Sequence, residues 1–571
     1  MIGVIAKADQ VATVEEFFQL FKTPWEFVNE GRAYDVVVAT VDDIPEVDAR
    51  LLVLYGAEAK NCDATLGVAQ RSRHRGVPLN YRGASLPIYG AVLTFSEGGA
   101  VVPCVTASGK SGEVAGFRAH AAGVTVMRLG YDLFGEVDHL LSAGQPPENA
   151  HVPTLDSHIM MLREWILDAG IPVVEIPPAP AGSRLVVCLT HDIDFAGIRN
   201  HRFDHTMWGF LYRSTIGAVR NLVRGRLSWR QLLHSWRAAM SVPFVWLGWA
   251  KDFWEPFEWY LRLEKSLPAT YFLIPFKGRP GDHVSGRHAT RRAAAYDVTD
   301  LPHWTATLMK EGHELGVHGI DAWHSVERGR EELRRIASVT GESRVGIRMH
   351  WLLRGENTFH VLENAGYAYD SSVGYNETIG YRCGTTQPFR PPGARDLLEL
   401  PMHIQDGALF YPNRLDLSEA EAWRRCERLI EHARSVGGVI TLLWHDRSHA
   451  AERFWGGFYS RLLQALKSTQ VWFATGAQAT AWFRKRRDVR FDLTELPDGH
   501  RRTRLRYEGD EIAPPLTIRV HRPSGEAGGT VSIGDTTPIF CDVTWNGRTP
   551  IEVEELHRLP VRQTTTGLPR Q

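Results

Sequence analysis

The chain has 571 residues, of which 43% are hydrophobic and 23% charged, as is typical of a globular protein with several domains. Its 65 basic and 66 acidic side chains nearly cancel, so the overall charge gives no reason to expect a nucleic-acid partner. The 6 cysteines form no Cys-x-x-Cys pair, which argues against a zinc ribbon and a disulfide scaffold and favours reduced thiols.

The N-terminal stretch MIGVIAKADQVATVEEFFQLF lacks the basic start, the long apolar core and the small-residue cleavage site of a secretory signal. No later run reaches the roughly 18 apolar residues that a membrane-spanning helix needs. We therefore expect a cytoplasmic protein that does not cross a membrane.

Residues 1–180 alternate short β-type runs with helical stretches, a pattern that predicts an α/β domain. The proline-rich stretch IPVVEIPPAPAGSR then provides a linker. The segment contains no GxGxxG loop, Walker loop or nucleophile elbow, so we assign no chemistry to it.

From Leu185 onward, short apolar strands alternate with polar loops and helical stretches. About eight such units over residues 183–486 predict a parallel, irregular (β/α) barrel. The predicted strands are RLVVCLT, ATYFLIP, HELGVH, VGIRM, YAYDSS, LLELPM, VITLLWH and VWFATG. Residues 487–560 are predicted to form a small β-rich domain, and residues 561–571 a disordered tail.

Reactive side chains fall at the ends of the predicted barrel strands. They are Asp192 and Asp194 after the first strand, His318 at the third, Arg348 at the fourth, Asp370 at the fifth, His403 at the sixth and His445 at the seventh. Because the carboxyl ends of parallel barrel strands open onto one face, we expect these side chains to converge there.

These residue types suit metal-assisted acid and base chemistry. Of two carboxylates one residue apart, one can bind a metal while the other accepts a proton from water. His318 ends its strand, where a neutral imidazole can coordinate a divalent cation, and His445 can protonate a leaving amine. His324 lies about 240° from His318 around an ideal helix, so it either joins His318 through a loop or is a polar residue at a helix start.

Together these motifs resemble those of the NodB-homology polysaccharide deacetylases, metal-dependent enzymes built on an irregular (β/α) barrel. THDID resembles the first motif, which implies that Asp192 is the catalytic base and Asp194 a metal ligand. GVHGIDAWHS resembles the second motif, GIRMHW stands where the third is expected, and ITLLWHD resembles the last. The resemblance covers roughly residues 183–486 and points to a subgroup that shares THDID, HGIDAW and RMHW.

The second motif departs from the family pattern, in which another metal-binding histidine stands four residues after the first. Ala322 occupies that position. We expect His324 to take its place beside Asp194 and His318, and His191, His350 and His403 are the alternatives. The resemblance implies a divalent metal, with zinc as our expectation.

The activity implied by the resemblance is hydrolysis of an N-acyl group, acetyl in the first instance, from an amino sugar in polysaccharide or lipid-linked glycan synthesis. Candidate substrate-binding residues are Arg348, Trp351, Arg390 and His403. Arg348 alternatively orients Asp192, and Trp351 alternatively belongs to the core. A catalytically inactive, deacetylase-like protein that binds carbohydrate or assists assembly is the alternative function.

A helical insertion at about 200–262 separates the first two predicted barrel strands. From His205 to Lys251 it contains six Arg, one Lys, five Trp and no Asp or Glu. This pattern predicts amphipathic helices that either cap the N-terminal domain or lie in an anionic membrane interface. In the second case the protein is peripheral to the inner face of the plasma membrane, which suits a lipid-linked sugar.

Overall fold

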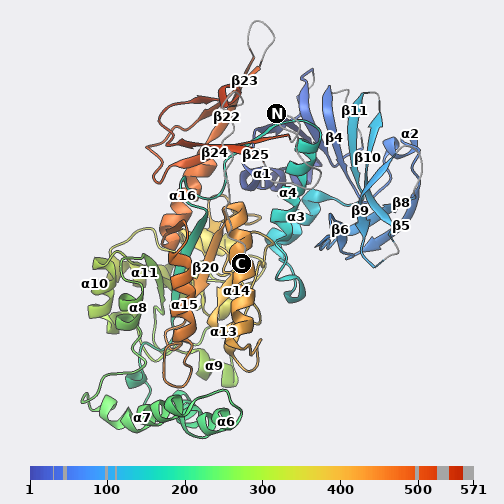
Figure 1. The fold of residues 1–571 in the computed structure, drawn as a ribbon. Coiled ribbons are helices and arrows are strands. Elements are labelled where there is room, and N and C mark those ends of the chain that lie inside the picture. The colour runs from blue at the N-terminus through green and yellow to red at the C-terminus, as the bar shows by residue number, and fades with distance from the viewer. Residues whose placement is uncertain are drawn as a thin grey trace. The chain divides into compact units, whose positions relative to one another are not determined.

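In the computed structural model, the described residues are 1–29, 31–42, 48–96, 101–109, 112–121, 123–495, 501–523 and 539–556. The chain divides into two compact units, and Figure 1 shows their elements. The first unit comprises Met1–Gly182, Cys383–Pro392 and the residues from Trp482 onward, and the second comprises Ser183–Arg382 and Gly393–Ala481. The predicted tail at 561–571 lies outside the described residues.

The first unit is built on a mixed sheet with the strand order β2, β1, β3, β4, β11, β10, β9, β6, β7, and with β5 and β8 attached beside β10. Strands from β2 to β11 in this order are parallel, and the others are antiparallel. The bounds are β1 (Ile2–Ile5), β2 (Trp25–Phe27), β3 (Tyr34–Ala39), β4 (Ala49–Tyr55), β5 (Gln70–Arg75), β6 (Leu79–Tyr81), β7 (Ala84–Leu86), β8 (Ala91–Phe95), β9 (Val102–Ala107), β10 (Val114–Ala121) and β11 (Val124–Leu129).

Helices of the first unit bury aromatic side chains. Phe17 of α1 meets Phe134 of α3 edge to face, with ring centroids 5.9 Å apart, and both are fully buried. On α4, Asp156 accepts hydrogen bonds from Thr385 and Thr386 of the segment Cys383–Pro392, which ties that segment into this unit. The bounds are α1 (Val11–Phe21), α2 (Asn61–Thr65), α3 (Leu133–Ser142) and α4 (Thr154–Asp168).

C-terminal strands add two small antiparallel sheets to the first unit. Strand β12 pairs with β24, and β24 with β25, so the C-terminal region pairs directly with a strand that precedes the barrel in the sequence. Strands β22, β23 and β26 form the other sheet. The bounds are β12 (Val173–Glu175), β22 (Arg490–Glu495), β23 (Arg501–Arg506), β24 (Leu516–Arg522), β25 (Ile539–Trp545), β26 (Ile551–Glu552), α16 (Gly476–Asp488) and α17 (Val553–Leu556).

A curled, wholly parallel sheet forms the second unit, with the strand order β18, β17, β16, β15, β14, β13, β20, β19 and with β21 paired to β13. Within residues 183–481, all of which are described, β18 and β19 do not pair, so the sheet is an open half-barrel. The bounds are β13 (Leu185–Ile193), β14 (Ala269–Leu273), β15 (Glu314–Gly319), β16 (Ile347–Met349), β17 (Tyr369–Asp370), β18 (Leu398–Glu399), β19 (Ile404–Gln405), β20 (Val439–Leu443) and β21 (Val471–Phe473).

All nine residues of β13 are buried, in keeping with its place between β14 and β20 in the middle of the sheet. The eight predicted strands each coincide with a strand of the structure, and the mixed α/β architecture is confirmed. Since every pairing is parallel, the carboxyl ends of these strands lie at one end of the half-barrel. That end carries Asp192, His318 and the first residues beyond β16 and β20.

Amphipathic helices cover the half-barrel. Ser325 caps α11 by accepting from the Arg328 N–H, and Gly341 ends the helix in the left-handed region at φ 73°, where glycine meets no Cβ strain. The bounds are α8 (Phe257–Leu263), α9 (Gly286–Arg292), α10 (Pro302–Lys310), α11 (Val326–Thr340), α12 (Thr358–Ala365), α13 (Asp406–Phe410), α14 (Glu419–Val436) and α15 (Gly456–Lys467).

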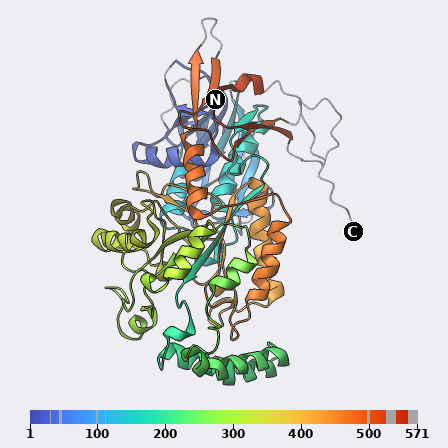
Figure 2. The same cartoon turned by 90° about the vertical axis from the view of Figure 1, so that its left-hand side faces the viewer.

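The insertion between β13 and β14 is helical. It contains α5 (His205–Tyr212), a π-helical turn η4 (Arg213–Gly217), α6 (Ala218–Val223) and α7 (Trp229–Trp246), which form a layer at one end of the second unit (Figure 2). Its buried residues Phe210, Val242 and Val245 pack with Ala450 and Ala451, which follow β20. Among the helices of the described chain, none combines the length and the apolar character that crossing a bilayer requires.

Candidate active site

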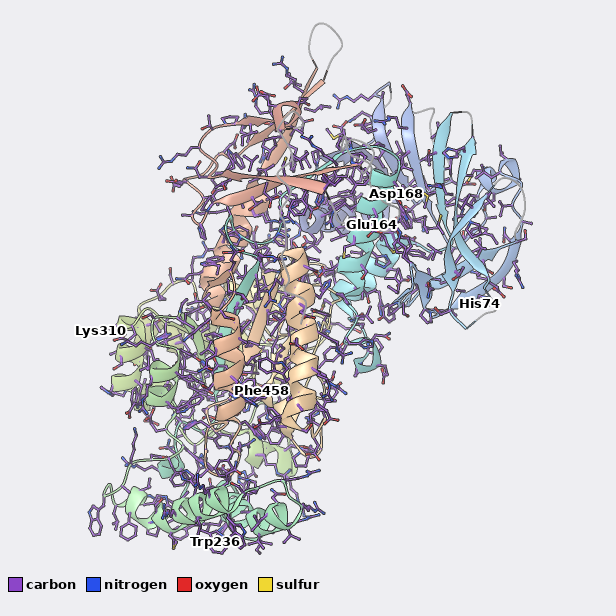
Figure 3. All side chains as sticks on the ribbon, viewed as in Figure 1. His74, Glu164, Asp168, Trp236, Lys310 and Phe458 are labelled. Carbon is purple, nitrogen blue, oxygen red and sulfur yellow. The ribbon has the colours of Figure 1, made fainter. Side chains whose placement is uncertain are left out.

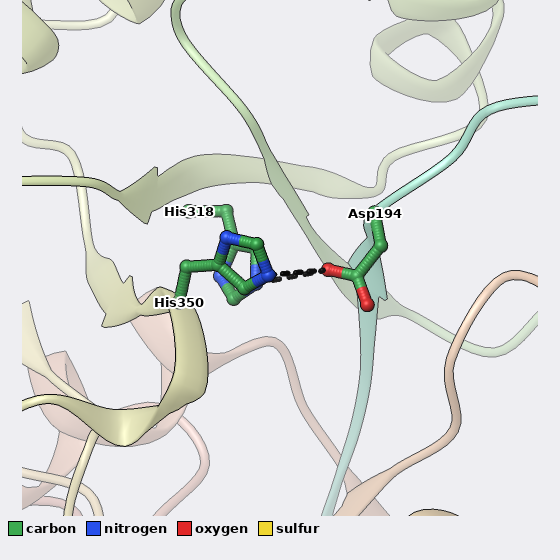
Figure 4. Close-up of side chains that lie close together, drawn as sticks. All are labelled: Asp194, His318 and His350. Atoms are coloured by element: carbon green, nitrogen blue, oxygen red, sulfur yellow. Dashed lines mark ion pairs between the residues drawn. The ribbon is translucent and has the colours of Figure 1, made fainter. Parts of the chain in front are cut away.

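Three side chains from neighbouring strand ends meet at the mouth of the half-barrel. Asp194 follows β13, His318 lies in β15 and His350 follows β16 (Figure 4). The Asp194 Oδ1 atom lies 3.3 Å from His318 Nε2 and 3.5 Å from His350 Nε2. His318 pairs in register with Arg348, and His350 is two residues further along, so both imidazoles lie on the same face of the sheet.

Each member of this group is held by burial and by contacts outside the group. His318 Nδ1 bonds the Arg348 carbonyl at 3.0 Å, which leaves Nε2 directed at Asp194. Burial lowers the pKa of His350 well below its usual value, although the charge of Asp194 opposes this shift. Burial also raises the pKa of Asp194, but the imidazoles of His350 and His318 outweigh this effect and keep the carboxyl ionised.

These residues fit a divalent cation. One carboxylate oxygen and two imidazole nitrogens lie within 4.8 Å of one another, and oxygen with nitrogen donors suits zinc. Asp194 Oδ1 is buried and makes no hydrogen bond within the described part of the chain, and no Lys or Arg in that part pairs with Asp194. A buried carboxylate without a cationic side chain is costly, and a bound cation would compensate for it.

His324, our first expectation for the third ligand, does not lie in this group. Strand β15 ends at Gly319, and the turn that follows directs His324 Nε2 to Asp321 Oδ1, 3.2 Å away. His350, one of the alternatives, lies beside Asp194 instead. His324 forms a second group with Asp321 and Asp282.

Asp192 is fixed by an arginine from β16, the third strand away from β13 in the sheet. Arg348 is fully buried, and its Nη1 atom donates to Asp192 Oδ1 at 3.1 Å and to Thr190 Oγ1 at 2.7 Å. Its Nε atom donates to the Ser371 carbonyl at 3.0 Å. Of the two roles considered for Arg348, this geometry favours the orientation of Asp192, whose Oδ2 lies 3.8 Å from His318 Nε2.

His445 is paired with a buried carboxylate. Its Nδ1 atom lies 2.6 Å from Asp406 Oδ1, and its backbone N–H donates to Asp406 Oδ2 at 2.8 Å. Burial lowers the pKa of His445, but the Asp406 charge and hydrogen bond dominate and raise it to about 10. The imidazole is therefore protonated at neutral pH, with Asp406 as its partner.

The loop after β13 is held in place from β20. Asp446 Oδ2 accepts from the backbone N–H groups of Phe195 and Ala196 at 2.7 and 2.9 Å. Ala196 has φ 56°, in the left-handed region, so this turn is strained and needs such support. The contact fixes the position of Asp194 relative to His445.

Other candidate residues lie elsewhere. Trp351 is at the rim, 36% exposed, with φ 67°. His403 is buried, and its Nδ1 accepts from the Thr441 backbone N–H, so it supports the sheet instead of facing substrate. Arg390 belongs to the first unit, where it pairs with Glu15 and Glu16, contrary to its expected place on the barrel rim.

Two further expected or alternative residues are structural. His191 is buried between the Trp444 carbonyl and the Glu264 carboxylate, away from Asp194. Asp370 is buried beside Ser372 and Glu399, and burial raises its pKa.

Sequence reasoning did not find the pairing of Asp406 with His445. The available signal was its place directly after a short apolar strand and at the first position of a helix, α13.

No protein-family profile and no curated protein sequence matches the chain. Solved structures do match. A protein from Mycobacterium smegmatis described as a polysaccharide deacetylase shares 19% identity over 54% of this chain and 95% of its own, with a TM-score of 0.33. Puue allantoinase shares 17% over 54% and 93%, with a TM-score of 0.34. The carbohydrate deacetylase Agd3 shares 10% over 96% and 99%, with a TM-score of 0.37. At these identities and TM-scores, the likenesses assign neither a family nor an activity to the chain.

Proposed function

We propose that this protein is a metal-dependent hydrolase that removes an N-acyl group, acetyl in the first instance, from an amino sugar in polysaccharide or lipid-linked glycan synthesis. One observation carries the proposal. An oriented carboxylate (Asp192), a protonated imidazole (His445) and a set of metal-type donors meet at one end of the half-barrel. Together they supply the base, the acid and the electrophile that amide hydrolysis requires.

Asp194, His318 and His350 would hold the cation, zinc in our proposal. When bound, a divalent cation acts as a Lewis acid that polarises a carbonyl and lowers the pKa of water. Asp194 would contribute a carboxylate oxygen, and His318 and His350 would contribute imidazole nitrogens, which are the donor types that this chemistry needs. The contact between His318 Nδ1 and the Arg348 carbonyl keeps Nε2 in the donor orientation.

In the proposed reaction, Asp192 accepts one proton and His445 donates another. Asp192 accepts a proton from water as the water oxygen attacks the acyl carbon, while Arg348 holds the opposite carboxylate oxygen. His445 donates its Nε2 proton to the amide nitrogen as the C–N bond breaks, which releases a free amine and a carboxylate. Asp406 stabilises the imidazolium before this step.

The geometry does not favour the alternative, an inactive carbohydrate-binding protein. Carbohydrate binding alone requires neither an imidazole held protonated by a buried carboxylate, as His445 is by Asp406, nor a carboxylate oriented by arginine, as Asp192 is by Arg348. The absent histidine at Ala322 carries less weight once His350 lies beside Asp194 and His318.

Acyl release from N-acetylated amino sugars, measured with the metal content of the purified protein, tests the proposal. We expect acetate release by metal-loaded protein, loss of release in Asp192→Asn and His445→Gln, and retention of metal in both variants. Retained carbohydrate binding without acyl release under any metal would support the alternative.

We further propose that the insertion rests on an anionic membrane surface and that the substrate is lipid-linked. Most large apolar side chains that are exposed in the described chain belong to this insertion. They are Phe203, Trp208, Tyr212, Ile216, Val219, Val223, Trp229, Leu233, Trp236, Met240, Phe244, Leu247 and Trp249.

Helix α7 has two apolar faces. One faces the rest of the unit and contains Leu232, Ser235, Ala238, Val242 and Val245. The other is exposed and contains Trp229, Leu233, Trp236, Met240 and Phe244, spaced three or four residues apart and followed by the exposed C-cap residue Leu247. Figure 3 shows Trp236 at the outer edge of the insertion.

Basic side chains surround the exposed face. Arg220, Arg224, Arg230 and Arg237 are exposed, and no Asp or Glu occurs between His205 and Lys251. Apolar and tryptophan side chains bordered by arginine match an anionic lipid surface, where each basic residue adds about 1 kcal/mol of attraction.

Co-sedimentation with vesicles checks this contact. We expect binding to vesicles that contain phosphatidylglycerol, weaker binding to pure phosphatidylcholine, and at least about tenfold weaker binding for Trp236→Gln combined with Met240→Gln. Met309→Gln, which changes an exposed apolar residue on α10, is the matched control. Dimerisation that the double variant abolishes, without vesicle binding, would assign the face to a second copy of the chain.

A further inference from the structure

Three arginines lie together where the insertion meets the loop after β20. Arg213 opens the π-helical turn η4, and Arg447 and Arg453 follow β20 in the sequence. Burial, then the charges of Arg447 and Arg453, lower the pKa of Arg213 to about 10, and burial, then the charge of Arg453, lowers the pKa of Arg447. For Arg453, burial is outweighed by the effects of Tyr411 and Glu452, so its pKa is raised instead. The three guanidinium groups are therefore close enough to repel one another.

Aromatic rings hold two of these guanidinium groups in place. Arg447 lies over the Phe195 ring at 3.9 Å and over the Trp254 ring at 4.7 Å. Arg453 lies over the Tyr411 ring at 4.6 Å and over the Trp455 ring at 4.7 Å. Stacking fixes the plane of a guanidinium and leaves its N–H edge available for a planar or tetrahedral anion.

The arginines of this cluster make no direct ion pair in the described part of the chain. Within the described part of the chain, none of Arg213, Arg447 and Arg453 forms an ion pair with a carboxylate, although Arg447 is only 8% exposed. The Nε atoms of Arg213 and Arg453 are buried and have no hydrogen-bond partner there. Arg447 is buried and Arg213 and Arg453 are half-buried, and burying guanidinium groups without a direct ion pair is costly to a folded protein, so a bound anion would compensate for the cost.

Two carboxylates lie near the cluster, and the charge of one of them, Glu452, acts on all three arginines without a direct ion pair. Glu452 Oε2 accepts from Trp254 Nε1 at 3.3 Å, and Asp446 Oδ2 accepts from the backbone N–H groups after Asp194. The excess positive charge also reaches Tyr411: burial raises the pKa of its phenol, but Arg453 and Arg447 outweigh burial and lower it below the usual value.

We propose that Arg213, Arg447 and Arg453 bind an anionic group of the substrate, a phosphate or a carboxylate carried by the amino sugar. Arg447 is two residues from His445 and lies on the ring of Phe195, which adjoins Asp194, so the anion would lie next to the reacting amide. The inference deepens the proposed function and rests on it. It assigns the substrate class as an anionic amino sugar.

Anion binding is tested first, without turnover. We expect inorganic phosphate to raise the Tm of the wild-type protein and of Arg424→Gln, which removes an exposed arginine on α14. Arg453→Gln should lose most of this rise. An equal rise in all three proteins, or none in the wild type, overturns the inference.

Substrate preference is tested next. We expect kcat/KM for N-acetylglucosamine 1-phosphate, or for an N-acetylated amino sugar with a carboxylate, to exceed that for neutral N-acetylglucosamine. The charged sugar that shows the excess identifies phosphate or carboxylate as the anion. In Arg453→Gln this ratio should fall by about tenfold to a hundredfold, as the loss of a charge-assisted hydrogen bond predicts.

The outcomes separate the two proposals. Hydrolysis of neutral and anionic sugars at equal kcat/KM, with no change of ratio in Arg453→Gln, overturns the anion subsite and leaves the hydrolase in place. Phosphate binding that depends on Arg453, together with no acyl release from any of the sugars, overturns the proposed hydrolysis and retains the anion site. A lower Tm of Arg453→Gln without phosphate would indicate a structural role for the stacked guanidinium instead.

Discussion

Two groups of histidine and carboxylate side chains lie in the second unit, and they differ in what surrounds them. Asp194, His318 and His350 are close to one another in the mouth of the half-barrel, and Asp194 Oδ1 makes no hydrogen bond in the described chain. In the second group, Asp321 Oδ1 already accepts from the Asp282 N–H at 2.9 Å and faces His324 Nε2 at 3.2 Å.

The two groups also differ in whether a carboxylate has a cationic side chain beside it. Asp282 Oδ2 of the second group has a cationic partner, Arg328 Nε, at 3.4 Å, and its carboxylate is exposed. Asp194 has only imidazoles beside it. Both groups have the spacing of metal ligands, and the one that we propose as the metal site is the one whose carboxylate oxygen lacks a hydrogen bond and a cationic side chain in the described chain.

The largest effect is expected for His350→Ala, and comparing it with His324→Ala shows which of the two groups binds the metal. His350→Ala removes a donor beside Asp194, and we expect loss of bound metal and a fall in kcat/KM of at least about a thousandfold, because several kcal/mol of charge stabilisation is lost. His324→Ala should keep its metal and its activity. Elemental analysis with acyl-release rates checks both. Loss of metal in His324→Ala and retention in His350→Ala would reverse the assignment.

Removing the proposed base should lower activity without removing the metal. Asp192→Asn keeps the size of the side chain and its contact with Arg348 but cannot take a proton from water, so we expect kcat to fall about a hundredfold or more. Metal content and kcat, measured on the same preparation, decide the point. Wild-type kcat in this variant would move the base elsewhere.

A change of pH dependence should follow from Asp406→Asn. The Asp406 carboxylate raises the pKa of His445, so its removal lowers that pKa. The acid form of His445 is then lost at lower pH, and the basic limb of the kcat/KM profile shifts to lower pH, with about tenfold less activity at pH 8. A basic limb that stays in place would show that another group is the acid.

The smallest effect concerns the second group. Asp321→Ala leaves the Asp282 N–H without its acceptor, and we expect the free energy of unfolding to fall by about 1 to 2 kcal/mol. Metal content should stay at the wild-type level. Urea unfolding measures the change, and metal loss in this variant would make the second group a metal site as well.

Much of the half-barrel could be predicted because its strands are buried apolar runs. The stretches from Leu185 to Leu189 and from Val439 to Leu443 consist almost wholly of apolar residues and form β13 and β20. Strand β19, only Ile404 and Gln405, is too short to show a period and was not predicted. The open edge between β18 and β19 depends on tertiary pairing.

The candidate site could be predicted in part. Asp192, Asp194, His318 and Arg348 meet because parallel strand ends share one face. His324 could not be placed, because a sequence does not show which way a turn directs a side chain after its strand has ended. Arg390 was assigned to the rim from its position between predicted strands, but its segment leaves the second unit altogether.

The π-helical turn η4 sets the orientation of everything after it in the insertion. A π-turn contains one residue more than an α-helical turn, and each residue rotates the following helix by about 100°. Val219 and Val223 are exposed on α6, the helix that follows this turn directly. A one-residue deletion within Arg213–Gly217 would therefore turn α6 about its axis and move its apolar stripe away from the outer side. In evolutionary terms, a single-codon deletion at η4 is a simple route by which relatives of this chain could lose the apolar surface without altering the half-barrel.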